Sequence, residues 1–537
     1  MFHLDRDAYD VSWKRQGLYE TPNISRLPSR DYAIYLVNTV KYHLGFFKLF
    51  DEDGFIQTLH DFYSGTVEDL EDYRLWYCKL LLVLAFGKGV LNQKKAPREP
   101  PGSDYFVRAM ANLPEMCALH EEPVLAMEVL TLISLYFYCM DMRQTAYSYI
   151  GQALRLALVE GNHTNLNGSQ LELQLAQRCT NNWWIMYILD RTLSSALGTP
   201  VSVHDDAIKN VLPEDSSLVL NVKLSRMVSL ILSELYNADG SLDDQYLSKV
   251  QSLLRQLAKL AEEIGETISI KFPSSMETVP KSAAHVRLMY HQCIILVTRP
   301  IMLVLLQKRI RDQSKQVDEL PAPVHDLLQT CVQSAIKTLK ILTSLSEYNM
   351  LDSFLPFDMD FASTAASALV VFKDIMDFDV PMTAKPLIDR ILGEMIASGN
   401  NAAQLRQQEI DRLHELASNF RQGRPPMRPS VPDVSTHGAA LMDVGPSSSN
   451  LSIQTPRSAQ QHLPSPGQTV ESNTFHDIQP TAFSITPSTD FEHNFALAQD
   501  DMLLIADRLD TDAFPGAMDT DVYSGDWLAP TMQFPPL

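Results

Sequence analysis

Residues 178–191 read RCTNNWWIMYILDR, and they decide the fold prediction. They belong to an amphipathic run over 171–197, in which one stripe at helical spacing holds Trp183, Met186, Asp190, Leu193 and Leu197. Gly198-Thr199-Pro200 follows, which is typical of a helix end. The run therefore predicts a long helix with a buried face. Because Asp190 lies on that face, we expect its carboxylate to be paired, with Arg155 or the neighbourhood of Arg191 supplying the cation.

Runs with the same periodicity continue from Asp31 to Gln422, and alternating apolar–polar runs of useful length are almost absent. No repeat of fixed period is found, so a simple solenoid is not expected. We expect an all-α chain with a helix from Asp31 and others at 71–86, 105–112, 123–140, 144–160, 171–197, 222–237, 243–264, 282–311, 324–345, 361–376 and 386–422. Gly87 and Gly89 are expected to end the helix at 71–86, and Gly399 to interrupt the last one.

Composition changes sharply after this helical body. Residues 424–537 hold 14 of the 31 prolines, and from Ser430 onward there are 2 basic and 14 acidic residues. Such a segment cannot bury enough apolar surface to fold alone. We therefore divide the chain into an irregular lead-in (1–28), a helical body (29–422), a disordered Ser/Pro/Gln-rich linker (423–489) and an acidic–hydrophobic segment (490–537).

The segment 490–537 places large apolar side chains among acids, which is the composition of acidic activation segments. The apolar residues that we assign to this role are Phe491, Phe495, Leu503, Leu504, Phe514, Trp527 and Leu528. Repulsion between the acids keeps these side chains in water, where the groove of a coactivator or mediator-type protein can accept them as a short helix. Residues 500–509 are the best helix candidate, with Leu503, Leu504 and Ala506-Asp507 near one face. The alternative is a tail that only confers solubility.

The formal net charge of −21 argues against nucleic-acid binding through bulk charge, although a small basic module stays compatible with it. The first residues carry charges where a secretory signal is apolar, and no uncharged apolar run reaches about 18 residues, so we expect a soluble intracellular chain without a membrane span. The six cysteines include no C-x2-C pair, so a zinc cluster is not expected within these residues. We expect them to be buried free thiols.

Two stretches, YIGQALRLALVEGNH at 149–163 and the run over 178–213, resemble the regulatory middle homology domain of fungal zinc binuclear cluster transcription factors. A weaker likeness extends over about 27–375. The positions that match the family pattern are Gly151, Ala153, Arg155, Arg178, Trp183, Trp184, Tyr187, Asp190, Arg191, Gly198, Pro200 and Pro213.

The resemblance implies a nuclear regulator or activator of RNA polymerase II genes, with DNA binding and zinc implied by kinship only and with homo- or heterodimers as partners. The family's C-x2-C-x6-C zinc cluster has no counterpart here, since the first cysteine is Cys78. Two interpretations stay open: a first exon is missing from the gene model, or the protein has no DNA reader of its own.

Elementary chemistry gives these motif residues structural roles. Gly151 and Ala153 permit a close helix crossing. Both tryptophans supply apolar core area. Gly198 and Pro200 serve the turn, and Asp205 and Asp206 cap the next helix.

Two other classes of function compete with this interpretation. One is a helical scaffold or corepressor that regulates transcription without contacting DNA. The remote one is an all-α terpenoid synthase, which needs a D-D-x-x-[DE] motif on a helix for magnesium. Neither Asp205-Asp206 nor Asp500-Asp501 has that pattern, and the common nucleotide, hydrolase and metalloprotease motifs are absent. We therefore expect no enzyme, and assign no catalytic, cofactor-binding or metal-ligating residue.

Overall fold

The computed structural model describes residues 8–15, 24, 26–48, 52–65, 73–91, 98–166, 172–236, 245–271, 281–311, 320–376, 378–422 and 499–508. These residues form fifteen α-helices and three short 3-10 helices, with no β-strand among them, so the all-α prediction is confirmed. The α-helices are α1 (Arg30–Leu44), α2 (Glu52–Ser64), α3 (Arg74–Val90), α4 (Ser103–Asn112), α5 (Pro123–Cys139), α6 (Arg143–Val159), α7 (Leu173–Leu197), α8 (Ser216–Leu235), α9 (Tyr246–Lys271), α10 (Lys281–Arg311), α11 (Ala322–Glu347), α12 (Pro356–Asp374), α13 (Ala384–Ala397), α14 (Asn401–Arg421) and α16 (Gln499–Arg508). The 3-10 helices are η1 (Gly45–Phe47), η2 (Ala118–His120) and η3 (Asp205–Ala207).

The predicted linker at 423–489 lies outside the described residues, as does the acidic segment except for 499–508. Helix α2 was not predicted. Helix α8 begins six residues before its predicted start, because the Asp215 carboxylate accepts the backbone N–H groups of Ser217 and Leu218 at 2.9 and 3.1 Å. The predicted break near Gly399 is present: this glycine adopts a φ of 91°, and the Asn400 side chain caps α14.

The prediction that Gly87 and Gly89 end α3 is wrong, since the helix continues to Val90. A Cβ on Gly87 would lie 2.7 Å from the Cβ of Leu36 in α1, and one on Gly89 would lie 2.4 Å from Phe354. Both glycines therefore let other parts of the body approach the α3 backbone. The helix continues through both glycines because they are needed for this close packing and not for a turn.

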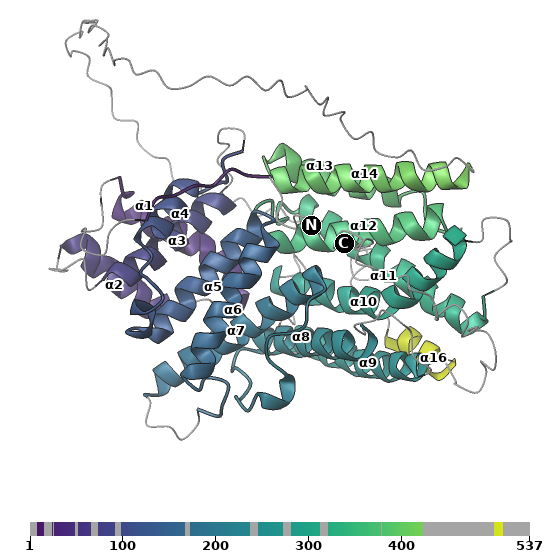
Figure 1. Cartoon of the computed structure of the whole chain (residues 1–537), viewed down its shortest axis with the longest axis horizontal. Coiled ribbons are helices and arrows are strands. Elements are labelled where there is room, and N and C mark those ends of the chain that lie inside the picture. The colour runs from purple at the N-terminus through teal and green to yellow at the C-terminus, as the bar shows by residue number, and fades with distance from the viewer. Residues whose placement is uncertain are drawn as a thin grey trace, which may run out of the picture. The chain divides into compact units, whose positions relative to one another are not determined.

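The helices from α8 onward form a stack, in which α14 covers α12, α12 contacts α10 and α11, α10 packs on α8, and α8 on α9 (Figure 1). Helix α10 is apolar and long enough to span a membrane by length and composition. However, 72% of its most apolar window is buried inside the body. Its composition is therefore that of a core helix, which contains Pro300 without being broken.

The lead-in at 1–28 has no helix in its described part, and it packs on the body. The hydroxyl of Tyr9 accepts the backbone N–H of Asn401 at 3.0 Å, which joins the start of the chain to α14. Trp13 packs edge-on against Phe106 of α4, with ring centroids 6.4 Å apart.

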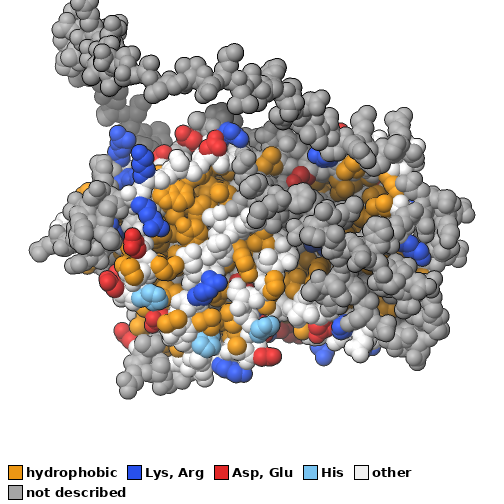
Figure 2. All heavy atoms as spheres, in the orientation of Figure 1, with side chains coloured by type: hydrophobic (Ala, Val, Ile, Leu, Met, Phe, Trp, Pro, Cys, Tyr) orange, Lys and Arg blue, Asp and Glu red, His pale blue; other side chains and the backbone are white. Residues whose placement is uncertain are grey.

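On the face shown in Figure 2, Lys and Arg side chains stand singly or in small groups among acidic and uncharged ones. Hydrophobic side chains occur between them, mainly in the left half of the view. The described part of this face therefore carries no broad basic surface of the kind that binds nucleic acid through phosphates.

Candidate functional site

The two tryptophans of α7 are core residues, as predicted. Both side chains are fully buried. The Trp184 indole Nε1 donates to the carbonyl of Val211 at 2.6 Å, and the Arg226 guanidinium lies over its ring, 4.9 Å from the centroid. The Trp183 ring packs near the His163 imidazole at 6.1 Å between centroids. The pair thus holds both flanking segments against α7.

Asp190 is buried and paired with its neighbour in α7, because Arg191 Nη1 lies 2.6 Å from Asp190 Oδ2. Ser202 completes the shell of this carboxylate: its hydroxyl donates to Oδ1 at 2.5 Å and its backbone N–H to Oδ2 at 3.2 Å. The expected buried pair is confirmed with Arg191 as the cation. Arg155 is not the partner, since it lies exposed on α6.

Arg191 extends the pair into a network. Its Nη2 lies 2.9 Å from Asp205 Oδ1 and also donates to the Val203 carbonyl, while the Tyr187 hydroxyl donates to Asp205 at 2.9 Å. We call Tyr187, Asp190, Arg191, Ser202 and Asp205 the Asp190 network. Burial raises the pKa of Tyr187 above its usual value, so its hydroxyl stays a donor. The network holds the loop after Gly198 on the end of α7.

Two predicted roles near this loop are wrong. Asp205 and Asp206 lie in η3, where no side chain caps the helix, because Asp205 is used by Arg191 and Asp215 caps α8 instead. Gly151 does not mediate a close helix crossing: the nearest heavy atom to an added Cβ is Nη1 of Arg155, at 3.4 Å. It lines a surface depression beside Pro200.

Four further motif residues lie in the core or at the turn after α7. Ala153 is fully buried in α6, and Pro213 is buried before α8. Gly198 ends α7 with a φ of 65°, and the carbonyl of Pro200 accepts the Tyr147 hydroxyl at 3.0 Å.

The structure joins the two motif stretches through their backbones. The carbonyl of His163, at the end of the first stretch, accepts the N–H groups of Lys209 and Asn210 at 2.7 and 2.9 Å. The Asn210 side chain returns a hydrogen bond to the carbonyl of Asn162 at 2.7 Å. Residues 149–163 and 178–213 therefore form one structural unit, although the hydrogen-bonded residues are more than 40 positions apart in the sequence.

A further buried charge cluster, which the sequence analysis did not predict, surrounds Glu128 of α5, and we call it the Glu128 cluster. The Glu128 carboxylate of α5 lies 2.7 Å from Lys79 Nζ of α3, and Arg178 of α7 grips both its oxygens at 2.6 and 2.7 Å. Asn182 adds a fourth bond at 3.2 Å. Burial alone would raise the pKa of Glu128, but Lys79 and Arg178 outweigh it and lower the pKa. In the sequence, only the position of one acid, Glu128, directly before the apolar run at 129–140 could have indicated a buried charge.

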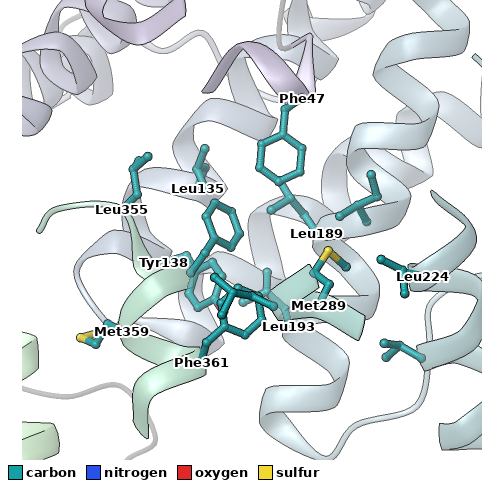
Figure 3. Packing of buried hydrophobic residues seen from close by; sticks show 14 of the residues in the cluster. Phe47, Leu135, Tyr138, Leu189, Leu193, Leu224, Met289, Leu355, Met359 and Phe361 are labelled. Atoms are coloured by element: carbon teal, nitrogen blue, oxygen red, sulfur yellow. The ribbon is translucent and has the colours of Figure 1, made fainter. Parts of the chain in front are cut away.

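A cavity lies on the other side of α7, between α7, α10 and α12. The volume of this cavity is about 80 Å³. Figure 3 shows Phe47, Tyr138, Met289 and Phe361 converging here from four elements. His285 is packed between Phe47 and Phe357, and burial lowers its pKa to about 3, so it is a neutral wall residue. The walls of the cavity are mainly apolar.

Residues 78–221 match the family model described as the fungal specific transcription factor domain. This range contains the Glu128 cluster, both motif stretches and the Asp190 network. Residues 78–221 are thus similar to this domain.

Curated relatives agree with this assignment. The chain is 22% identical over 311 residues to an uncharacterised transcriptional regulatory protein of Schizosaccharomyces pombe, covering 55% of this chain and 38% of the relative. It is 24% identical over 319 residues to the thiamine repressible genes regulatory protein of the same yeast, covering 55% and 39%. A stress gene activator of Candida albicans is 26% identical over 203 residues, covering 35% and 20%. The chain thus spans about two fifths of the first relatives' length.

Beyond the fungal transcription factor domain, the predicted helix in the acidic segment is present as α16. Met502 and Ala506 of α16 are fully buried in the same hydrophobic core as the rest of the body, while Leu503 and Leu504 are 37% and 51% exposed. Ala506 therefore does not share a face with the two leucines, contrary to the prediction. The other apolar residues assigned to activation, which are Phe491, Phe495, Phe514, Trp527 and Leu528, lie outside the described residues.

Helix α16 is docked on α9 (Figure 1). The Gln251 side chain of α9 donates to the carbonyl of Ala506 at 2.7 Å, and Arg255 Nη2 lies 3.0 Å from Asp507 Oδ1. This decamer is thus part of the folded body and not of a disordered tail.

Five of the six cysteines are buried free thiols, and Cys117 is exposed. Burial raises the pKa of Cys78, Cys293 and Cys331 to about 12, so these thiols are protonated and unreactive. Within the described part of the chain, no group of three or more His, Cys, Asp or Glu side chains is placed to hold a metal ion. Zinc remains an expectation from kinship alone.

Proposed function

We propose that this chain works as a fungal transcriptional regulator in the nucleus, with the helical body as its regulatory module and the acidic C-terminal segment as its activation segment. The observation that carries this proposal is the family match over 78–221, whose two motif stretches the fold joins into one unit. The domain and its relatives are named as transcriptional regulators, so we propose no enzymatic activity.

The activation role of the C-terminal segment is supported by α16. Leu503, Leu504 and Asp507 are exposed on this helix, so an apolar pair stands beside an acid. Such a face fits a hydrophobic groove of a coactivator with a basic rim, since amphipathic helices are recognised through apolar side chains spaced along one face.

The docking of α16 on α9 supports a restraint on this activity. A coactivator groove that wraps α16 needs Met502 and Ala506 as well as the leucines, and both are covered in the docked state. The hydrogen bond from Gln251 and the exposed Arg255–Asp507 ion pair are worth about 1 kcal/mol each or less. These two polar contacts add to the burial of Met502 and Ala506, so a coactivator that binds all of α16 has to replace both kinds of contact.

The activation role is tested by fusing the full chain to an unrelated DNA-binding module and reading a reporter gene. We expect activation, and the double variant Leu503→Ala with Leu504→Ala should lower output several-fold. Leu416→Ala is the matched control, because Leu416 is a 45% exposed leucine on α14, away from this segment. Equal output from the double variant and the parent would refute the activation role of α16.

The restraint is tested separately by changing only α9. Gln251→Ala with Arg255→Glu should raise reporter output several-fold, since it removes one bond and places two acids together. Arg390→Glu, which reverses an exposed arginine on α13, should leave output unchanged. Unchanged output from the α9 variant would end the restraint proposal and leave the activation proposal standing.

DNA contact, zinc and a dimeric state are proposed by kinship alone. Chromatin occupancy of the tagged chain, with and without a zinc-cluster partner protein, tests this part. Occupancy that depends wholly on the partner would favour the corepressor or scaffold interpretation over a direct DNA-binding regulator.

A further inference from the structure

A groove lies on the surface of the body between α6 and the loop segment at 200–203, and its volume is about 320 Å³. We call it the α6 groove. Helix α6 packs against α7, from which this loop segment continues (Figure 1). From Tyr147 to Leu158 the α6 wall is about 17 Å long at 1.5 Å per residue. It consists of residues that recur at three and four positions on one helix face, which are Tyr147, Gly151, Leu154, Arg155 and Leu158.

The loop wall of the α6 groove is held in place. The Asp190 network binds the backbone of Ser202 and Val203 from the side of α7. The Tyr147 hydroxyl donates to the carbonyl of Pro200 at 3.0 Å and so connects the two walls. Because both walls are fixed before anything binds, a ligand loses little binding energy through ordering them.

Gly151 leaves open space in the α6 wall. Apart from its own helix backbone, a Cβ on this residue would meet one heavy atom within 4 Å, which is Nη1 of Arg155 at 3.4 Å. Gly87 and Gly89 of α3 differ, because a Cβ on either would collide with another part of the body. A glycine inside a helix is less favourable than an alanine, and packing within the described body does not explain its use here. The α6 backbone at Gly151 is therefore accessible to a group from outside.

Arg155 is the one charged residue among the described residues that line the α6 groove. It is exposed, and it forms no ion pair or hydrogen bond with any residue that the structure describes. A carboxylate can pair with a guanidinium through two parallel hydrogen bonds. The formal net charge of −21 opposes an acidic partner at long range, but salt screens this repulsion beyond about 8 Å at physiological ionic strength. The local charge therefore favours an acidic group beside Arg155.

The rest of the lining is mainly apolar. Leu154 and Val203 are buried, while Leu158 and Val201 are half-buried and offer apolar surface to a ligand. The volume of about 320 Å³ lies at the lower end of the range for binding sites. At about 3.3 Å per residue, the wall matches about five residues of an extended peptide. The groove thus fits a short peptide segment in which an apolar side chain neighbours an acid.

We propose that the α6 groove docks an extended segment of about five residues from a partner protein. Its apolar side chain lies over Gly151, and the neighbouring aspartate or glutamate binds the Arg155 guanidinium. A nucleic acid fits less well, because its phosphates need several cations and this groove has one. The proposal goes beyond the regulator role and does not require it, since it concerns binding by the folded body alone.

The test selects random seven-residue peptides, displayed on phage, on the immobilised full chain. Phages that bind the Gly151→Phe variant are first removed. In this variant a ring fills the groove, while its Cβ meets only the flexible end of Arg155. We expect the enriched peptides to share an apolar residue next to an aspartate or glutamate. No enrichment, or enriched peptides without this pair, would overturn the proposal.

The role of Arg155 is measured by fluorescence anisotropy with the most enriched peptide and with a second peptide in which an amide replaces its acid. The acidic peptide should bind the full chain roughly fivefold more tightly, as expected for an exposed ion pair. Arg155→Gln should remove this preference and leave the affinity for the amide peptide within about twofold. Equal affinity for the two peptides, or an unchanged preference in Arg155→Gln, would refute Arg155 as the anchor.

Two control variants should change neither affinity. Arg412→Gln removes an exposed arginine of α14, and Gly265→Phe adds a ring in open space on α9. Far-ultraviolet circular dichroism confirms that each variant is folded. A synthetic peptide of residues 509–537 that competed more strongly than the selected peptide would assign the groove to this chain's own acidic segment and overturn a partner protein as the occupant. None of these measurements depends on transcription, so failure of the reporter experiments leaves them readable.

Discussion

Replacing Glu128 by glutamine should destabilise the body more than any change of similar size at the surface. The carboxylate is 0% exposed, Lys79 is 3% exposed and Arg178 is 28% exposed. Glutamine keeps the shape and one acceptor oxygen, but it removes the negative charge that faces the buried Lys79 ammonium and the Arg178 guanidinium. Removing one partner of a buried pair costs about 3–5 kcal/mol. Because Arg178 can reach water, we expect the low end, about 3 kcal/mol.

Thermal unfolding of the full chain gives the measurement. At about 2 °C per kcal/mol, the low end for larger domains, the midpoint should fall by roughly 6 °C. Lys79→Met alone should cost about 1–2 kcal/mol, because Arg178 and Asn182 still hold the carboxylate. In the double variant both members of the Lys79–Glu128 pair are gone, so its cost should be smaller than the sum of the single costs by at least about 1 kcal/mol.

The control is Glu262→Gln, the same change on the exposed side of α9, which should stay within about 0.5 kcal/mol of the parent. The pKa of Glu128 is lowered, so its contribution is present above its unfolded pKa and is lost as the pH falls through the folded one. Glu128→Gln should therefore flatten the acid limb of the stability curve. A cost of Glu128→Gln below about 1 kcal/mol, or a double variant whose cost equals the sum of the single costs, would refute the argument that Glu128 compensates the charge of Lys79.

Three further outcomes follow from other buried groups. Asp190→Asn should cost about 1.5–3 kcal/mol in chemical denaturation because it weakens the bonds to Arg191, and an unchanged midpoint would contradict the buried pair. Gly89→Ala should cost about 1–3 kcal/mol through its contact with Phe354, whereas Gly265→Ala, with open space in α9, should be neutral or stabilising. Burial and Asp352 raise the pKa of Asp358 from 3.8 to about 7, so the stability of the parent should fall as the pH rises from about 4 to 7; melting curves should show Asp358→Asn gaining more relative to the parent at pH 8 than at pH 5.

Periodicity was sufficient for most of the helices, because apolar residues at helical spacing mark the side of a helix that is buried. It missed α2. The prediction of a helix end failed at Gly87 and Gly89. A glycine that ends a helix cannot be distinguished in the sequence from a glycine inside a helix that allows close packing. The difference lies in Leu36 and Phe354, which are far away in sequence. Local signals cannot contain that information.

The charge clusters were harder to predict for the same reason. Asp190 was expected to be paired because it lies on the apolar stripe of its helix, and one of its two candidate cations, Arg191, is adjacent in sequence. The partners of Glu128 are 49 and 50 residues away on two other helices, so only the anomaly of a lone acid beside an apolar run was visible. Likewise, the sequence predicted a helix at 500–509, but the face of α16 that packs against the body depends on contacts with Gln251 and Arg255 of α9.

Both facing walls of the cavity are held by buried charge. Lys281 at the start of α10 pairs with Asp352, which also lies 2.8 Å from His43 of α1, while Asp360 of α12 pairs with Arg143 of α6. Apolar contacts tolerate a shift of one helix along another, but a buried charge displaced from its partner loses several kcal/mol. We therefore infer that these pairs fix the register of α10 against α12. That register places Arg299 at the cavity edge.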